Sequence, residues 1–417
     1  MVMLVVEPRL RSHFLEAIRR TRRDTRFWQG FLLELQRRPE NFGRISGYGR
    51  TNQWFRQVTW RLLSRSKKKS TGSALGQLRL GSAIVTPKGS KLCFTSLRKF
   101  SPKAALAEKP APTKTGSWSW RHNNSSLKIN FVEQSSVGDK CLLLLPTVSD
   151  VSTTEEWKAV SQDIVTKDSS WRSVTVDWPG FGLSDRPAID YTADTLEKFL
   201  VDFVMAQDGP LGSTTAPVIA GGGHAATIAA KAIAGGKINA RALVAVAPTW
   251  AGPLPIVFGQ SPDAVSKYGF LRGALRAPAV GWALYNALVS SRSNIRKQYE
   301  SHVYSESSNV TDAIVDSRLA LTKLPGARYA PAAFLTGLLD PVKSREEFVE
   351  LFGALDGKVP ALVMVSTASP RRSRAEMEAL RDAKGVAKLV EIPGALLAHE
   401  EFPGRVASEL YEFLSNL

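Results

Sequence analysis

Short apolar runs rich in β-branched residues alternate with helical patterns from residue 118 to the end of the chain. This alternation predicts an α/β protein with a mostly parallel central sheet and helices on both of its faces. In such a sheet a ligand site lies beyond the carboxyl ends of the strands. The predicted strands are 127–133, 141–145, 171–177, 216–220, 241–247, 359–365 and 387–392, and the predicted helices are 155–165, 193–205, a helix beginning near 224, 373–382 and 403–414.

A sharp turn is expected where the strand 216–220 runs into the next helix. The letters there follow the pattern G-x-S-x-G, in which a serine nucleophile stands at the apex of a strand-to-helix turn. Gly221 takes the first position and Ala225 the last, so the apex falls on Gly223. A residue with a side chain is strained at such an apex by about 1–3 kcal/mol, and glycine avoids most of that strain. We therefore expect the turn to be present without its nucleophile.

Residues 249–353 interrupt the alternation with a stretch rich in helix formers and aromatic residues, which predicts an inserted helical lid over the end of the sheet. The aromatic residues include Trp282, Tyr285, Tyr299, Tyr304, Phe334 and Phe348. The expected organisation is therefore a leader (1–108), the first part of the core (109–248), the lid and the return to the core (249–353) and the last part of the core (354–417).

The formal charge of +17 comes from one part of the chain. Residues 1–108 hold 23 Lys and Arg against 6 Asp and Glu, whereas residues 109–417 hold 32 of each kind. The body therefore gives no electrostatic reason to expect nucleic acid or an anionic membrane as a partner. Residues 41–107 lack Asp and Glu and are rich in Ser and Arg, which is typical of a disordered organelle transit peptide. The alternatives are a basic arm that binds nucleic acid or a membrane, or an extension foreign to the native protein.

Cofactor, metal and membrane signals are weak. Cys93 and Cys141 lie too far apart in the sequence to suggest a disulfide framework or a zinc site, and Cys141 heads an apolar run typical of a core strand. No apolar run reaches the roughly 18 residues of a membrane-spanning helix. We expect no cofactor, no metal and no membrane span.

Several local patterns, in order along the chain, resemble those of the α/β-hydrolase superfamily. Residues 177–187 are similar to the D-x-P-G-x-G-x-S-D-x-P segment of these proteins, the turn at Gly223 follows at the expected interval, and residues 400–403 resemble the stretch after their histidine loop. The resemblance covers about residues 118–417 and implies an α/β-hydrolase fold. The chain is most similar to the chloroplast-targeted plant and cyanobacterial members, through residues 334–337 and 370–380. Together with the leader, this implies a chloroplast location, with the mitochondrion as the alternative.

Family membership implies a triad of nucleophile, acid and histidine, and in this alignment each of the three positions holds a different residue. The nucleophile position is Gly223. The acid belongs in a G-x-x-D-P loop after the second-last strand, where this chain has Ser369 before Pro370. The histidine belongs five residues before Glu401, where this chain has Leu396. The resemblance therefore implies that the catalytic triad is lost.

Three residues are fallback candidates for a rearranged site. Asp340 lies in a second G-x-x-D-P, at 337–341, where the lid rejoins the core. His399 lies three residues past the expected histidine position, and the simpler expectation for it is a surface histidine beside two glutamates. His224 directly follows the apex and is expected to face the pocket, where a lone imidazole has nothing beside it to activate.

Main-chain donors of an oxyanion hole are the part of the machinery that the resemblance leaves in place. They would be the N–H of His224 and that of Thr147 or Val148, after the strand 141–145. Thr147, Val148, Gly223 and His224 are therefore the predicted ligand-binding residues. The leading hypothesis is a non-catalytic protein that binds a small molecule or a partner. The alternatives are an active hydrolase of ester, epoxide or similar substrates with a rearranged site, and a protein that functions through its basic arm.

Overall fold

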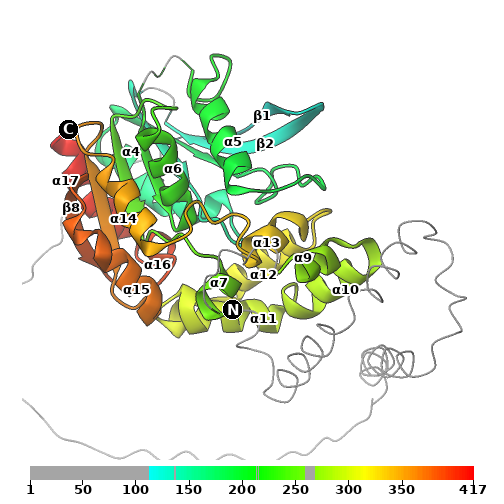
Figure 1. Cartoon of the computed structure of the whole chain (residues 1–417). Helices are drawn as coiled ribbons and strands as arrows, with labels where there is room; N and C mark the ends of the chain where they lie inside the picture. Colours follow the sequence, from blue (N-terminus) through cyan, green and yellow to red (C-terminus); the bar gives the residue numbers. More distant parts are fainter. Residues whose placement is uncertain (1–111, 136–137, 213, 215, 259–267) are drawn as a thin grey trace, which may run out of the picture. The chain divides into compact units, whose positions relative to one another are not determined.

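The computed structural model of the chain describes residues 112–417 except 136–137, 213, 215 and 259–267. It contains one eight-stranded sheet with the order β1-β2-β4-β3-β5-β6-β7-β8 (Figure 1). The pairs β1·β2 and β2·β4 are antiparallel and all other pairs are parallel. The strands are β1 Thr113–His122, β2 Ser125–Gln134, β3 Lys140–Leu145, β4 Trp171–Val176, β5 Val218–Gly222, β6 Ala242–Val246, β7 Ala361–Ser366 and β8 Val386–Ile392. The predicted α/β-hydrolase fold is confirmed, whereas the predicted leader lies outside the described residues.

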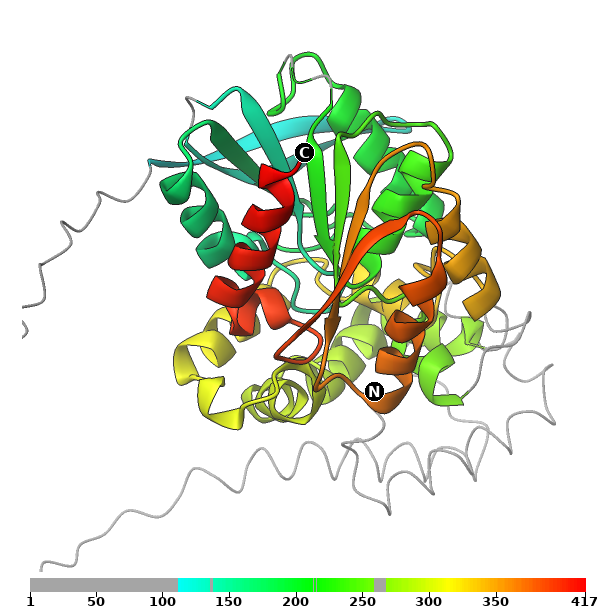
Figure 2. The ribbon, with the colours of Figure 1, turned by 90° about the vertical axis from the view of Figure 1, so that its left-hand side faces the viewer.

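Helices cover both faces of this sheet, and their apolar sides form two separate core clusters. One cluster lies between the sheet and α4 and α17, and the other lies between the sheet and α5, α6, α14 and α15. Figure 2 shows α4 and α17 on the opposite side of the sheet from α6 and α14. The bounds are η3 Thr154–Trp157, α4 Lys158–Lys167, α5 Ala193–Met205, α6 His224–Ala234, α14 Arg345–Gly353, α15 Arg371–Glu378, η6 Ala379–Asp382, α16 Ala398–Glu401 and α17 Pro403–Ser415.

A group of short helices separates β6 from α14, within the segment predicted to form a lid. Figure 1 shows these helices gathered beyond one end of the sheet. Phe334 of this segment packs its ring edge-on against His224, which places the helices at the carboxyl end of β5. Their bounds are α7 Pro253–Phe258, α9 Gly269–Arg276, α10 Pro278–Leu288, α11 Arg292–Gln298, η4 Tyr299–Val303, η5 Ser307–Asn309, α12 Asp312–Thr322 and α13 Tyr329–Leu335.

The loop 177–187, which carried part of the resemblance, folds around the buried carboxylate of Asp177. That carboxylate accepts the backbone N–H groups of Thr154 and Leu183 at 2.8 and 2.9 Å and the side-chain amide of Asn130 at 2.8 Å. A Cβ at Gly182 would lie 2.1 Å from it, so only glycine fits there. Burial raises the pKa of Asp177 to about 6, although these donors oppose the shift. The motif therefore has a structural role in joining β4 to α5.

Among the described residues, no helix combines the length and apolar character needed to cross a membrane. Within the same residues, no three His, Cys, Asp or Glu side chains gather closely enough to hold a metal ion. Cys141 is buried and carries a free thiol, and burial raises its pKa. Its environment is that of a core residue at the start of β3.

Candidate functional site

The strand-to-helix turn lies between β5 and α6, with Gly223 at its apex. Gly223 has φ 54° and ψ −128°, in the region where a side chain is strained, and its N–H donates to the carbonyl of Val246 at 3.0 Å. The turn is tight, because a Cβ at Gly221 would lie 2.8 Å from the backbone nitrogen of Ala226. Small residues are therefore needed on both sides of the apex, which is what the sequence pattern supplies.

Two hydroxyl-bearing side chains surround the space that a side chain at the apex would enter. A Cβ at Gly223 would lie 3.3 Å from Oγ1 of Thr249 and 3.5 Å from Cγ2 of Thr147. A Cβ at Gly222 would lie 2.6 Å from Cε1 of His399 and 2.7 Å from Cγ2 of Thr147. The apex is closely packed, and the residue before it leaves no room for even a methyl group.

The positions aligned with the acid and the histidine of a triad lie in ordinary structural environments. Ser369 is buried, and its hydroxyl is 2.5 Å from the hydroxyl of Ser366 at the end of β7. Leu396 packs, half-buried, against the larger core cluster. In the part of the chain that the structure describes, neither residue makes a hydrogen bond with an imidazole or a carboxylate.

His399 is not the surface histidine that its two glutamate neighbours suggested, because its side chain is fully buried. Its Nε2 lies 3.3 Å from Oε2 of Glu156, and its ring stacks on Trp157 with centroids 4.3 Å apart. The prediction was wrong because both neighbouring glutamates, Glu400 and Glu401, contact the inserted helical segment instead of solvent. Glu401 accepts the backbone N–H groups of Ser305 and Glu306, and it thereby holds α16 inward.

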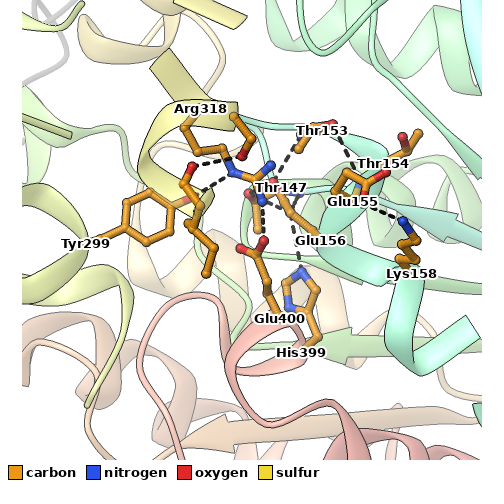
Figure 3. Close-up of polar contacts among 12 residues, drawn as sticks. Thr147, Thr153, Thr154, Glu155, Glu156, Lys158, Tyr299, Arg318, His399 and Glu400 are labelled. Atoms are coloured by element: carbon orange, nitrogen blue, oxygen red, sulfur yellow. Dashed lines mark hydrogen bonds and ion pairs between the residues drawn. The ribbon is translucent and has the colours of Figure 1, made fainter. Parts of the chain in front are cut away.

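A buried polar network joins α16 to the inserted helices (Figure 3). Glu400 is ion-paired with Arg318 of α12, whose Nε also donates to the hydroxyl of Tyr299 at 2.9 Å. Arg318 is 2% exposed. Burial raises the pKa of Glu400, and the neighbouring guanidinium opposes the shift. Glu156 also lies close enough to Arg318 to interact with its charge, so two carboxylates face one guanidinium.

Thr147, one of the predicted oxyanion donors, is committed to the same network. Its backbone N–H donates to Oε2 of Glu156 at 2.7 Å, and its hydroxyl donates to the same oxygen at 3.0 Å. The N–H of Val148, by contrast, has no protein acceptor among the described residues. Of the two alternatives left open by the sequence, the structure therefore leaves Val148 as the available donor. The first N–H groups of α6, including that of His224, point out of the helix end.

The structure brings His224 and Asp340 together. His224 is buried, its Nε2 lies 3.5 Å from Oδ1 of Asp340, and its Nδ1 lies 2.8 Å from Oγ1 of Thr249. Oδ1 of Asp340 also accepts the N–H of Gly252 at 2.8 Å. The sequence predicted an isolated imidazole at His224. The structure instead gives it two polar neighbours, Thr249 and Asp340. The third fallback candidate, His399, belongs to the separate network around Glu156.

Thr249 is the residue at this site that the sequence analysis did not single out. It follows β6, is half-buried, and is one of the residues that line a small cavity. Its position after Ala247-Pro248, at the carboxyl end of a predicted strand, was the signal that could have identified it. The cavity is lined by Thr249, Trp250, Ala251, Ile256, Arg372, Ser373 and Glu376.

Comparison with known proteins agrees with this architecture. A structure of Cfl2 from Burkholderia cenocepacia is 19% identical, with a TM-score of 0.53 over 72% of this chain and 95% of that one. A putative alpha/beta hydrolase from Nostoc is 16% identical, with a TM-score of 0.53 over 73% of this chain and 99% of that one. A thermophilic esterase from Thermogutta terrifontis is 19% identical, with a TM-score of 0.51 over 73% and 98%. At these identities the likeness establishes the fold alone.

No curated protein matches the chain in sequence. The model of the alpha/beta hydrolase family matches residues 152–409, which is more than half of the chain and includes the elbow, the insertion and α16. The chain therefore belongs to the alpha/beta hydrolase family.

Proposed function

We propose that this protein lacks the Ser-His-Asp triad of its family and acts in the plastid as a ligand-binding or interaction protein. The observation that carries the proposal is the apex residue Gly223, which has the strained backbone of a nucleophile elbow and no side chain. Loss of a triad in a serine hydrolase removes on the order of a millionfold in turnover. Serine-type hydrolysis is therefore negligible at this elbow.

The groups that remain suit a small molecule with a carbonyl or carboxylate oxygen. Main-chain donors at the start of α6 and at Val148 favour an anionic or polar oxygen, because the helix N-terminus carries partial positive charge. The hydroxyl of Thr249 lies 2.8 Å from Nδ1 of His224, the first residue of α6, and Thr249 is only half-buried. The inserted helices α9 to α13 would cover a ligand bound there as a lid.

Labelling with a fluorophosphonate probe tests the loss of serine chemistry. The full chain is incubated with the probe beside an esterase of known activity, and adducts are located by peptide mass spectrometry. We expect no serine of this chain to be labelled while the esterase reacts completely. A stoichiometric adduct on any serine near the elbow would show that the triad positions have been wrongly assigned.

The plastid location is supported by the acid-free, Ser- and Arg-rich composition of residues 41–107. A fusion of residues 1–108 to a fluorescent protein should accumulate in chloroplasts of transformed plant cells. A fusion that carries the same residues in scrambled order is the matched control. Accumulation in mitochondria would support the alternative location, and uniform cytosolic fluorescence would contradict both.

A hydrolase with a rearranged site is the second candidate, and the His224–Asp340 contact is the observation that favours it. Such an enzyme would release product continuously from a small ester. Purified protein that turns over p-nitrophenyl acetate many times per chain, and loses this activity in Asp340→Asn, would replace the first proposal with the second.

A further inference from the structure

The hydroxyl of Thr249 stands beside the apex that lacks a nucleophile. Its Oγ1 is 3.3 Å from the position that a Cβ at Gly223 would occupy. The apex glycine carries no side chain, so the hydroxyl lies next to the position where a nucleophile would stand. Thr249 is only half-buried, so part of this residue is open to solvent.

The hydrogen bonds around His224 set the direction in which a proton can move. An ionised carboxylate only accepts hydrogen bonds, so the contact with Asp340 places the ring proton on Nε2. Nδ1 is then an acceptor, and the hydroxyl of Thr249 donates to it across 2.8 Å. This is the order of hydroxyl, imidazole and carboxylate that activates a nucleophile, with the two ring nitrogens exchanged relative to a serine triad.

The loop that presents Thr249 is held in place by its surroundings. Thr227, fully buried on α6, donates its hydroxyl to the carbonyl of Thr249 at 2.7 Å. Ala247, two residues earlier, has φ 45°, a left-handed conformation that is strained for a residue with a Cβ. Strain of this kind persists only where surrounding contacts enforce it, and it is frequent at functional sites.

Asp340 is also accommodated by specific features of the fold. A Cβ at Gly252 would lie 3.1 Å from its Oδ1, and a Cβ at Gly337 would lie 3.0 Å from its Oδ2. Gly337 has φ 78°, so glycine is required there on two grounds. The carboxylate is thus fixed against the imidazole by backbone that approaches from two loops.

We propose that Thr249 is an acyl acceptor, activated by His224 and Asp340, and that the ligand is a small ester or lactone captured covalently on its hydroxyl. The inference rests on the proposed ligand-binding function and names the ligand class and the atom that holds it. Oγ1 of Thr249 forms a bond to the carbonyl carbon while its proton passes to Nδ1 of His224. The bond to the departing alkoxide then breaks, and the alkoxide takes that proton. The products are an ester on Thr249 and an alcohol, which is released when the ligand is an open-chain ester and stays attached to the acyl group when it is a lactone.

Charge that develops on the carbonyl oxygen during this step needs hydrogen-bond donors. The N–H groups of His224 and Val148 lie at this end of the sheet, and within the described part of the chain neither donates to another protein group. Fixed donors of this type stabilise the oxyanion of acyl transfer without reorganisation. The same donors that favour binding of a carbonyl oxygen therefore also favour its attack by Thr249.

Acetylation by p-nitrophenyl acetate tests the inference on the full chain. We expect a burst of one p-nitrophenolate per chain and an acetyl group on Thr249, located by peptide mass spectrometry. General-base assistance of about 10²–10⁴-fold should make Thr249 react far ahead of the exposed hydroxyl of Thr367 in the same sample. Absence of acetyl from Thr249 in the folded chain, or its equal presence in urea-unfolded chain, would overturn the inference.

Substitutions separate the relay from a merely structural role. Thr249→Val should abolish the burst, Thr249→Ser should retain it, and Thr367→Val is the matched control that should leave it unchanged. His224→Gln and Asp340→Asn should slow acetylation of Thr249 by about 10²-fold or more, with circular dichroism confirming that each variant is folded. An unchanged rate in both would exclude the relay.

The outcomes also distinguish this inference from the proposed function. Acetyl on a serine at the elbow contradicts the proposed function, whereas no adduct at all contradicts the inference alone. Sustained release of p-nitrophenolate that disappears in Thr249→Val would confirm Thr249 as the acyl acceptor and show that the protein is an enzyme.

Discussion

Replacing Gly222 by alanine should destabilise the protein far more than replacing the apex residue Gly223. A methyl group at Gly222 would lie 2.6 Å from His399 and 2.7 Å from Thr147, and both side chains are fixed by hydrogen bonds to Glu156. Overpacking of this type costs about 1–3 kcal/mol. If His399 yields, its buried hydrogen bond is lost as well, at a further cost of about 1.5–3 kcal/mol. We expect a total loss of about 2.5–6 kcal/mol.

Gly223→Ala and Gly236→Ala are matched controls for that substitution. Both residues have positive φ, 54° and 66°, so alanine costs about 1–2 kcal/mol at either through backbone strain. A Cβ at Gly236 meets nothing within 4 Å, and the nearest atom to a Cβ at Gly223 is 3.3 Å away. Gly236→Ala therefore measures backbone strain alone, whereas Gly223→Ala adds one tight contact, with Oγ1 of Thr249.

Equilibrium chemical denaturation of the full chain measures the three losses. For a domain of this size each kcal/mol corresponds to about 2 °C in the melting temperature. Combining Gly222→Ala with His399→Ala should recover part of the loss, since one of the two colliding side chains is removed, and the coupling should reach about 1 kcal/mol. A Gly222→Ala variant no less stable than Gly236→Ala would refute the rigidity of the network around Glu156.

Three further predictions concern single residues. Burial raises the pKa of Asp177 to about 6, so this carboxyl contributes stability below its unfolded pKa of 3.8 that is lost as the pH rises through 6. Unfolding measurements from pH 4 to 7 should show that the free energy of unfolding falls by about 3 kcal/mol relative to Asp177→Asn. Burial lowers the pKa of His302 to about 3, so its contribution is lost as the pH falls below 6.5, by about 3 kcal/mol at pH 4 against His302→Gln in the same assay. Gly404→Ala, in the first turn of α17 with open space around it, should raise the melting temperature through a gain of about 0.4–1 kcal/mol.

The core strands and the turn were predictable because their signals are local. The run 142–145 and the strand 241–247 are apolar because buried parallel strands contact core on both faces. β1 was missed, because most of its side chains are exposed and its sequence is polar. The alternating residues Trp118 and Trp120 were the sequence pattern that indicated a strand with one buried face. That pattern was too short to distinguish β1 from the linker before it.

The polar contacts of the site were not predictable, because their partners lie far apart in the sequence. His399 and Glu156 are separated by 243 residues, and His224 and Asp340 by 116. His399 is buried in contact with Glu156. A glutamate in the predicted helix 155–165 would be expected on an exposed face. Thr249 lies beside the apex residue Gly223 in the fold, but no sequence pattern relates these two positions.

The polar groups around the apex explain why loss of the serine is more than the loss of one side chain. A serine hydrolase needs its oxyanion donors and its imidazole free to respond to the transition state. Here the N–H of Thr147 and the ring of His399 both form hydrogen bonds with Glu156, so neither is free to respond to a transition state. A serine placed at Gly223 would find that imidazole already paired and the hydroxyl of Thr249 crowding its Cβ. The contact between Thr249 and His224 lies beside the apex and does not involve Glu156, so we expect any reactivity at the apex to depend on this pair.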